Sequence, residues 1–456
     1  MALSRPVDQK WWVLAAVGTG SFMAALDGSV VNTILPVIQN SFHSSVAVVE
    51  WIITVYLLAL SGFLLTFGRL GDLRGHKSVY VWGFGIFVAS SALCGASRSI
   101  ELLIICRGIQ AVGGAMLASN ALAILTTNFP ARQRGRALGL VSMMTYLGLT
   151  VGPSLGGWLA QAFSWRAVFY INVPVGALAL TLSLACIPKG EPNESGQKFD
   201  LVGAALLLAG LVALMLGLNQ GAEWGWTSLP ILVLLLAAVL ILTVFVLAEQ
   251  RFPAPMLDLS LFRVPLFSAS VISAVLNYIC VYTITFLMPY YLIQGRGLNP
   301  AQAGLLLTAE PIVMAIAAPI SGAFSDRIGS RWPGMAGMAL MGVGLFLLAG
   351  LGSTSALWFA ALALAVAGLG TGMFISPNTS ALMGSAPKQR QGIASGVQAA
   401  ARNTGMVLGI GLAGAIFTTH LLQGTPEALF RGIDMGFLAA FGVAILGIVM
   451  SAIKEK

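Results

Sequence analysis

The feature that most constrains this chain is a succession of long apolar stretches separated by short polar ones. A transmembrane helix needs about 20 mostly apolar residues, and stretches of this kind recur fourteen times in 456 residues. Only 9% of the residues are charged, whereas soluble domains carry roughly 25%. The sequence therefore predicts an all-α membrane protein with fourteen transmembrane helices. The predicted spans lie near residues 11–38, 48–68, 78–97, 101–126, 136–160, 167–187, 201–219, 229–248, 266–292, 302–324, 333–351, 356–382, 392–419 and 434–453. The first, ninth and thirteenth are long, and a tilt or a kink would fit them to a bilayer.

Lysine and arginine are distributed unevenly over the loops. With the N-terminus placed in the cytoplasm, eighteen of the 24 basic residues fall on the cytoplasmic side and four fall outside, while Arg107 and Arg402 lie within spans. This asymmetry follows the positive-inside rule. We therefore expect a multi-pass protein of the cell's inner (cytoplasmic) membrane with both termini in the cytoplasm. The net charge of +8 is not gathered into a basic patch with interleaved aromatics, so nucleic acid is not an expected partner.

Several other classes of protein lack support in the sequence. The four cysteines lie singly inside apolar segments without the spacing of a metal site, and we interpret them as packing residues. The P-loop pattern GxxxxGK[ST] is missing from the sequence, which disfavours ATP-driven pumping. A membrane metal cluster or a nucleophile–base pair is not visible either. We expect no enzyme activity, no cofactor and no metal.

Two pieces of sequence recur at nearly constant distance. GRLGDLRGHK (68–77) follows the second predicted span, and SGAFSDRIGSR (321–331) follows the tenth, at an offset of 254 residues. PARQRGRALG (130–139) precedes the fifth span, and PKQRQGIASG (387–396) precedes the thirteenth, at an offset of 257. Matching offsets at matching places in the topology indicate two homologous halves.

The repeat divides the chain into three parts. Residues 1–195 form an N-terminal six-helix bundle, residues 196–250 an inserted pair of transmembrane helices, and residues 251–456 a C-terminal six-helix bundle. Paired bundles around a site at the membrane midplane are the architecture of rocking transporters.

Two motifs place charges inside predicted spans of the first half. LDGSVVNTILPVI (26–38) puts Asp27 roughly halfway through the bilayer, and RGIQAVGGAMLASN (107–120) puts Arg107 inside the membrane from the outer end. A carboxylate at that depth is costly and is a functional hypothesis by default, because burial favours its neutral form and a nearby cation its charged form. Arginine is essentially never deprotonated, so Asp27 is its natural partner. We expect Asp27 to be a proton-coupling residue and Arg107 its charge partner; the alternative is a permanent ion pair that clamps the helices.

The second half carries its own charged residues. Glu310 in the tenth span and Arg402 in the thirteenth each lie about 14–16 Å from the end of the helix. Glu310 is the second proton-coupling candidate, with Arg402 as its charge partner. A static pair between them is the alternative. Glu50 and His43, near the outer end of the second span, are interpreted as interfacial.

The fifth span carries a motif rich in small residues, GLTVGPSLGG (148–157). Its proline removes one backbone hydrogen bond and permits a bend, and its glycines form a flat face that favours close approach to a helix of the other half. The residues assigned to this conformational element are Gly148, Gly152, Pro153, Gly156 and Gly157.

Taken in order with GRLGDLRGHK, these motifs resemble those of the fourteen-span drug:proton antiporter family of the major facilitator superfamily, over essentially the whole chain. WRAVFYINVPVG (165–176) also resembles that family's entry to span six. The resemblance implies a cytoplasmic gate in which the loop aspartate meets a helix end or arginines and holds the outward-open form shut inside. The family often has Arg directly after this aspartate, where this chain has Leu73. The implied gate residues are Gly68, Asp72, Arg74, Gly75 and Lys77; the alternative is a solvated loop whose charges only keep it on the cytoplasmic side.

The resemblance implies proton-coupled export of apolar or cationic drugs by alternating access, with a monomer, protons, a small-molecule substrate and the lipid bilayer as the expected participants. Quaternary-ammonium exporters of the family carry extra carboxylates in spans two, ten and thirteen. The matching places here hold Thr54, Met314 and Gln398 with Asn403, which disfavours divalent cationic drugs. The alternatives are export of a native metabolite, lipid or siderophore, and a non-transporting membrane sensor, which would need an appended signalling domain.

Overall fold

The computed structural model describes residues 6–188, 201–249, 259–386, 391–421 and 427–452, and these residues are almost entirely helical. A 3-10 turn (η1) and a π-helical turn (η2) interrupt the series of α-helices. The elements run in chain order as α1 (Pro6–Thr33), α2 (Leu35–Phe42), α3 (Val46–Arg74), α4 (His76–Ala96), α5 (Ile100–Asn128), α6 (Ala131–Ala162), α7 (Ala167–Tyr170), α8 (Asn172–Cys186), α9 (Leu201–Trp224), α10 (Leu229–Glu249), η1 (Leu259–Arg263), α11 (Pro265–Pro289), η2 (Tyr290–Gly295), α12 (Pro300–Leu307), α13 (Ala309–Ile328), α14 (Arg331–Ala349), α15 (Leu357–Ser385), α16 (Gln391–Leu421) and α17 (Ala428–Ser451).

A helix occupies each of the fourteen predicted stretches. Within the described residues, twelve segments are long and apolar enough to cross a membrane. The two predicted spans outside this set fall on α6, which combines glycines with several polar residues, and on α9, whose apolar part is the shorter Ala205–Leu214. The protein is thus an all-helical, multi-pass membrane protein, and fourteen crossings stay a prediction.

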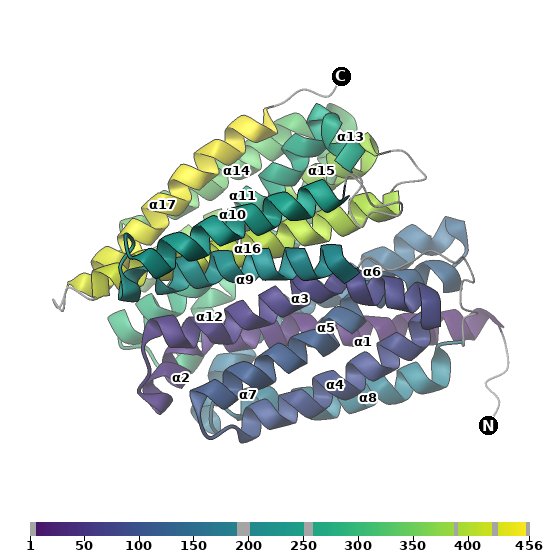
Figure 1. Ribbon diagram of the computed structural model, residues 1–456, viewed down its shortest axis with the longest axis horizontal. Coiled ribbons are helices and arrows are strands. Elements are labelled where there is room, and N and C mark those ends of the chain that lie inside the picture. The colour runs from purple at the N-terminus through teal and green to yellow at the C-terminus, as the bar shows by residue number, and fades with distance from the viewer. Residues whose placement is uncertain (1–5, 189–200, 250–258, 387–390, 422–426, 453–456) are drawn as a thin grey trace.

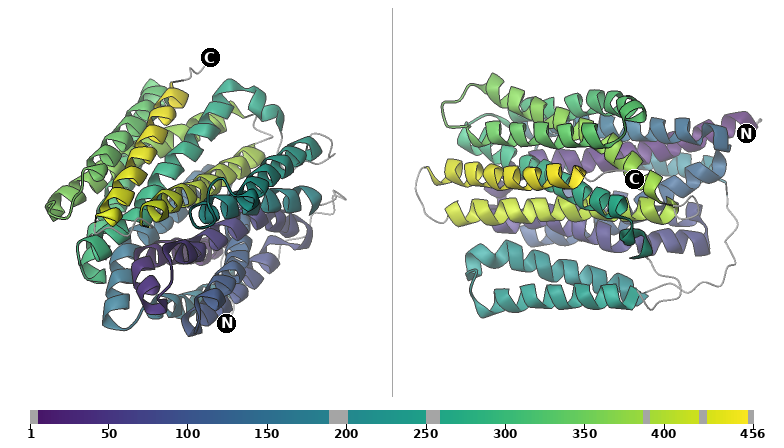
Figure 2. Two further views of the ribbon diagram at one scale, coloured as in Figure 1. Left: turned by 60° about the vertical axis from the view of Figure 1, so that its left-hand side comes forward. Right: turned by 90° about the horizontal axis from the view of Figure 1, so that it is seen from above.

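The helices form two bundles with a helical hairpin beside them (Figures 1 and 2). In Figure 1, α1–α8 make up the lower bundle, and α11 and α13–α17 the upper one, while the short α12 reaches the lower bundle, where it packs on α6. Helices α9 and α10 pack on each other, and α9 also contacts α3 of the first bundle and α16 of the second. The inserted hairpin therefore lies along the junction of the two bundles rather than inside either.

Prolines mark the places where the long predicted spans are interrupted. The first span breaks at Ile34, with Pro36 in the first turn of α2, and the ninth passes into η2 directly after Pro289. Proline lacks the backbone N–H that would continue an α-helix. By contrast, α16 runs unbroken from Gln391 to Leu421.

The two bundles touch mainly at the end opposite the N-terminus, which we call the far end. There α6 packs on α12 and α3 packs on α16. Ser154 Oγ and Thr308 Oγ1 are 2.6 Å apart, and Gln294 Nε2 donates to Gln39 Oε1 at 2.7 Å. Toward the end that carries the N-terminus the helix axes of the two bundles diverge (Figure 1). We call the α6–α12 and α3–α16 contacts the far-end seam.

Candidate functional site

The centre of the first bundle holds a buried ion pair. Asp27 of α1 and Arg107 of α5 are each 1% exposed, and Arg107 Nη1 lies 2.6 Å from Asp27 Oδ2. The structure therefore brings together the two side chains that were expected to pair. Since an unpaired charge at this depth would be strongly disfavoured, the pair accounts for how both charges can be buried.

The ion pair belongs to a larger hydrogen-bond network. Asp27 Oδ1 accepts from Asn172 Nδ2 at 2.6 Å and from Gln110 Nε2 at 3.0 Å. Gln110 Nε2 also donates to Ser91 Oγ at 2.6 Å, while Gln110 Oε1 accepts from Arg107 Nη1 at 2.6 Å. The carboxyl group thus receives three donors from two helices, α5 and α8, and the network extends to α4 through Ser91.

Arg107 has further partners beyond the carboxylate. Its Nε donates to the carbonyl oxygen of Ile52 in α3 at 3.3 Å. The guanidinium carbon lies 4.1 Å from the ring centre of Tyr56, also in α3, and 5.9 Å from that of Phe169. A cation over an aromatic face is stabilised by the ring quadrupole. The buried arginine therefore ties α3 as well to the Asp27 network.

Gln110 and Asn172 were missed by sequence reasoning. Gln110 stands three residues after Arg107 in the motif RGIQ, and Asn172 stands in the motif FYINVPVG. Residues three apart lie on one helix face, so the spacing of Arg107 and Gln110 was an available signal. Nothing in the sequence ties Asn172 to Asp27, because the contact spans 145 residues.

Glu310 sits in the first turn of α13 and is 9% exposed. The sequence left open whether Glu310 couples protons or forms a static pair with Arg402, and that pair does not form. Among the described residues, the ion pairs within 4.0 Å are Asp27–Arg107 and Arg431–Glu427. Both Glu310 and Arg402 nevertheless interact electrostatically with the phenol of Tyr282 in α11. Depth along a helix was predicted, but depth alone does not determine which side chains face one another.

Two tyrosines connect the charged residues of the two halves. Tyr56 in α3 interacts electrostatically with Asp27 and Arg107 on one side and with Tyr282 on the other. Tyr282 in turn interacts electrostatically with Glu310 and Arg402. The charged residues of the two halves are therefore linked by electrostatic interactions through these two phenols.

The expected gate residues lie around the junction of α3 and α4. Gly75 has φ 89° between the two helices, a backbone conformation that strongly favours glycine. Lys77 Nζ donates to the carbonyl oxygens of Leu184 and Ile187 at the end of α8, and cations are favourable there because the last carbonyls of a helix are unpaired. Arg74 is exposed, and Gly68 faces Ser119. The side chain of Asp72 lies outside the described part of the structure, so the latch stays a prediction.

The glycine motif of α6 was expected to face a helix of the other half, but most of it faces α1 of the same half. Added Cβ atoms at Gly148, Gly152 and Gly156 would meet α1 of the same half, whereas Gly157 lies against Pro300 of α12 in the other half. The carbonyl of Pro153 is correspondingly close to Gly304 of α12. Close approach to the other half was thus a wrong expectation for three of the four glycines, because the stripe winds around α6 and only its last turn reaches the far-end seam.

The sequence suggested that Glu50 is interfacial, but in the structure it is buried and only 1% exposed. Its carboxylate occupies the space beside Gly414 of α16, in the far-end seam, and it interacts electrostatically with Tyr290. His43 is exposed at the end of α2. The seam between the halves therefore contains a buried acid.

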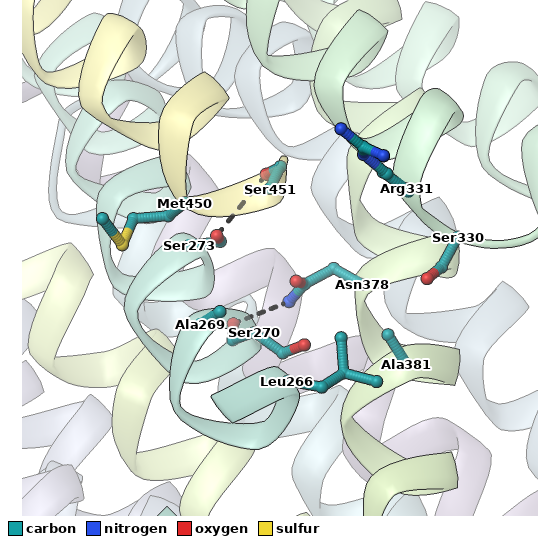
Figure 3. A pocket seen from close by; sticks show the side chains of 11 residues that line it. Leu266, Ala269, Ser270, Ser273, Ser330, Arg331, Asn378, Ala381, Met450 and Ser451 are labelled. Atoms are coloured by element: carbon teal, nitrogen blue, oxygen red, sulfur yellow. Dashed lines mark hydrogen bonds between the residues drawn. The ribbon is translucent and has the colours of Figure 1, made fainter. Parts of the chain in front are cut away.

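A small polar pocket lies within the second bundle, between α11, α14, α15 and α17 (Figure 3). Asn378 Nδ2 donates to the carbonyl oxygen of Ser270 at 3.0 Å, and Ser451 Oγ is 3.4 Å from Ser273 Oγ. Arg331 on its rim is the repeat counterpart of Lys77, at the same offset of 254. Because all the lining residues belong to one half, this pocket is not placed between the bundles where a cargo would pass.

A multi-pass helical protein with two bundles and a buried charge network at their centre has the architecture of a secondary transporter. The family described as the Major Facilitator Superfamily matches residues 17–248 and 270–455. The chain belongs to the major facilitator superfamily, and it is a transporter of that superfamily. Its relatives are transporters rather than enzymes.

Three relatives illustrate the range of the similarity. The riboflavin transporter RibZ of Clostridioides difficile is 32% identical over 450 residues, which cover 98% of this chain and 97% of that protein. The multidrug resistance protein Stp of Mycobacterium tuberculosis is 33% identical, covering 92% of this chain and 79% of Stp. The tetracenomycin C resistance and export protein of Streptomyces glaucescens is 33% identical, covering 91% and 78%.

Solved structures agree in fold. The peptide transporter POT in complex with sulfate superposes with a TM-score of 0.71 at 16% identity, covering 96% of this chain and 94% of that one. A bacterial homologue of the human lysosomal transporter Spinster, in an inward-facing and occupied conformation, gives a TM-score of 0.68 at 15% identity, covering 98% and 97%. At this identity the likeness shows the fold alone.

Proposed function

We propose that this transporter is a proton-coupled exporter, an antiporter that moves drug-sized organic molecules out through the cytoplasmic membrane by alternating access. The observation that carries the proposal is the Asp27 network. A titratable carboxyl group, 1% exposed, accepts hydrogen bonds from Arg107, Gln110 and Asn172, so the state of one proton is linked to contacts between α1, α5 and α8.

Protonation of Asp27 would remove the counter-charge of Arg107 and replace an acceptor oxygen by a hydroxyl donor. Arg107 would keep Gln110 Oε1 and the carbonyl of Ile52, but the bond between α1 and α5 would weaken. Each charge that crosses the membrane potential contributes about 2.3 kcal/mol per 100 mV. One proton at 100 mV therefore sustains a gradient of a neutral cargo of roughly 40-fold. Glu310, buried at the junction of the bundles, is proposed as a second coupling group.

We further propose a frame for the cycle. Residues 1–195 and 251–456 form the two moving bundles, residues 196–250 the inserted hairpin, and the chain crosses the membrane fourteen times with both termini in the cytoplasm, as a monomer. In this orientation the far-end seam closes the outer side, and the conformer faces inward. Gly68, Asp72, Arg74, Gly75 and Lys77 would form the gate that closes the cytoplasmic side in the opposite conformer.

The cargo is proposed to be largely apolar and aromatic. The relatives described above are a riboflavin transporter, a tetracenomycin C resistance and export protein and a multidrug resistance protein. Asp27 is neutralised by Arg107, and the places of extra carboxylates hold Thr54 and Met314, so we do not extend the proposal to divalent cationic drugs. Export of a native metabolite is the second candidate, which the similarity to a riboflavin transporter favours.

The test is drug-driven proton release in proteoliposomes, with riboflavin, an aromatic polyketide and ethidium as cargo. Asp27→Asn should abolish coupled release because it fixes the neutral state at nearly the same size. Glu310→Gln should give a partial, cargo-dependent loss. Asp434→Asn is the matched control, since it makes the same change in a carboxyl group of α17 that belongs to neither charged centre.

Apparent melting temperatures measured alongside separate loss of coupling from loss of folding. Asp27→Asn protein that remains folded, exports at the wild-type rate and still dissipates a pH gradient with cargo would exclude Asp27 as the coupling group. Wild-type protein that moves cargo without any proton flux would exclude the antiport mechanism itself.

A further inference from the structure

The second bundle contains a cation that the proton-coupling proposal does not use. Arg402 lies eleven residues into α16, about 16 Å along the helix by its rise per residue. Within the described residues no carboxylate lies within 4.0 Å of it, and its buried Nε has no hydrogen-bond partner. Arg107, the other arginine inside the spans, is fully paired by contrast.

An unpaired arginine in this position calls for a ligand. The guanidinium group cannot lose its proton, and a charge at membrane depth is found against a partner or facing a cavity that contains water. Arg402 is only partly buried, whereas its Nε is buried without a partner. A planar guanidinium with free donors suits the paired oxygens of a carboxylate or another oxyanion.

The surroundings of Arg402 are aromatic and come from both halves. Its charge interacts with the phenols of Tyr146 in α6, and of Tyr278 and Tyr282 in α11. Helix α6 belongs to the first bundle and α11 to the second. A ligand held at Arg402 would therefore lie within electrostatic range of tyrosines from both bundles.

The charges around this position never sum to a negative value. Asp27 and Arg107 cancel each other. Arg402 and Glu310 remain near Tyr282, and they give zero net charge when Glu310 is ionised and one positive charge when it is protonated. Glu50 lies farther from Arg402, in the far-end seam. It is beside Gly414, and Gly414 follows Arg402 by twelve residues in α16. A cationic cargo finds no excess negative charge here, whereas the acidic group of an anion finds an unpaired guanidinium.

From these observations we infer that Arg402 is a substrate-binding residue, and that it takes the acidic group of a planar aromatic anion whose rings lie among Tyr146, Tyr278 and Tyr282. This inference rests on the proposed transport function and specifies its substrate class. An ionised Glu310 would offset the charge of Arg402 and compete with the anion, so proton uptake at Glu310 favours binding of the cargo. The proton that is exchanged against the cargo is then assigned to Asp27.

The experiment compares two dyes that share a xanthene ring system but differ in charge, anionic carboxyfluorescein and cationic rhodamine 6G. Binding of each to the purified full-length protein in lipid nanodiscs is measured by fluorescence anisotropy. The wild-type protein should bind carboxyfluorescein more tightly. Arg402→Gln should weaken carboxyfluorescein by about tenfold or more, the range of one charge-assisted hydrogen bond, and should leave rhodamine 6G within about twofold.

Three further variants sharpen the result. Arg402→Lys keeps the charge but loses the planar fork, and it should retain part of the preference for the anion. Glu310→Gln removes the competing carboxylate, so carboxyfluorescein should bind as tightly as before or more tightly. If Arg402 served only as a structural partner of Glu310, even the wild-type protein would not bind the anion. Arg431→Gln is the matched control, because it removes a positive charge from an exposed pair with Glu427.

A wild-type protein that prefers rhodamine 6G, or an Arg402→Gln protein with unchanged affinity for carboxyfluorescein, overturns the inference. Equal weakening of both dyes in a folded Arg402→Gln protein also overturns it. These outcomes are separable from failure of the transport proposal. Cargo-driven proton release without anion preference would sink only the role of Arg402, and tight anion binding without proton release would sink only the antiport.

Discussion

The Asp27–Arg107 pair allows a quantitative prediction, because the carboxylate and the guanidinium differ in whether they can become neutral when the partner is removed. Asp27→Asn leaves a buried cation that cannot lose its proton. The asparagine has one oxygen where the carboxylate has two, yet three donors point at it, from Arg107, Gln110 and Asn172. Whichever way the amide is turned, at least one donor faces a donor.

Arg107→Gln leaves a buried carboxylate instead, and a carboxylate can escape its desolvation cost by taking up a proton. It also keeps the amide donors of Gln110 and Asn172. With about 1.5–3 kcal/mol for a charge-assisted hydrogen bond, we expect Asp27→Asn to destabilise by about 3 kcal/mol and Arg107→Gln by about 2 kcal/mol. The double variant should cost about 3 kcal/mol rather than their sum, a coupling of about 2 kcal/mol.

The assay is reversible unfolding in mixed micelles of a mild detergent and sodium dodecyl sulfate, at fixed lipid and protein concentration. The Arg431→Gln/Glu427→Gln cycle is the control, because that pair is exposed and should couple by less than about 1 kcal/mol. Additive costs for Asp27 and Arg107, or a larger cost for Arg107→Gln than for Asp27→Asn, would refute the reasoning.

Three further predictions concern the seam and the gate. Gly157→Leu should spread the far-end seam, because its Cβ would meet the carbonyl of Pro300; spin-label distances across the seam should lengthen, and unchanged distances would contradict this contact. Gly75→Ala should lower the melting temperature by an amount corresponding to about 1–2 kcal/mol, because φ is 89° there; equal stability would show that the backbone relaxes. Gly414→Ala should loosen the seam, because an added Cβ would meet the carboxylate of Glu50; hydrogen exchange at the far ends of α3 and α16 should become faster, and unchanged exchange would contradict this contact.

The helices and the Asp27–Arg107 pair could be predicted from sequence because both follow from the cost of polar groups in lipid. Apolar stretches of sufficient length must be helical there, and two opposite charges at similar depth in one half have few other partners. The same reasoning was insufficient for Glu310 and Arg402. Similar depth along two helices does not determine whether two side chains face each other.

Neutral polar residues were harder to interpret than charged ones. Gln110 and Asn172 bind Asp27 directly, but an amide inside a span is common enough in helix packing that it signals little by itself. Glu50 was misplaced for a different reason. Its position near a helix end suggested contact with water, while its burial depends on α16, which lies more than 300 residues later in the chain.

The two halves thus hold their charges in different ways. In the first half three donors, from Arg107, Gln110 and Asn172, converge on the carboxyl group of Asp27, so a proton taken up there would change contacts between helices. In the second half Glu310 and Arg402 both act electrostatically on Tyr282 without forming an ion pair, so Arg402 is left for an outside ligand. We therefore propose a cycle in which the first half senses the proton and the second half holds the cargo. Tyr56 is in electrostatic range of Asp27, Arg107 and Tyr282, and this pair of phenols is the candidate link between the two centres. In such a cycle, the descent of the two halves from one repeated unit would have been followed by a division of labour between them.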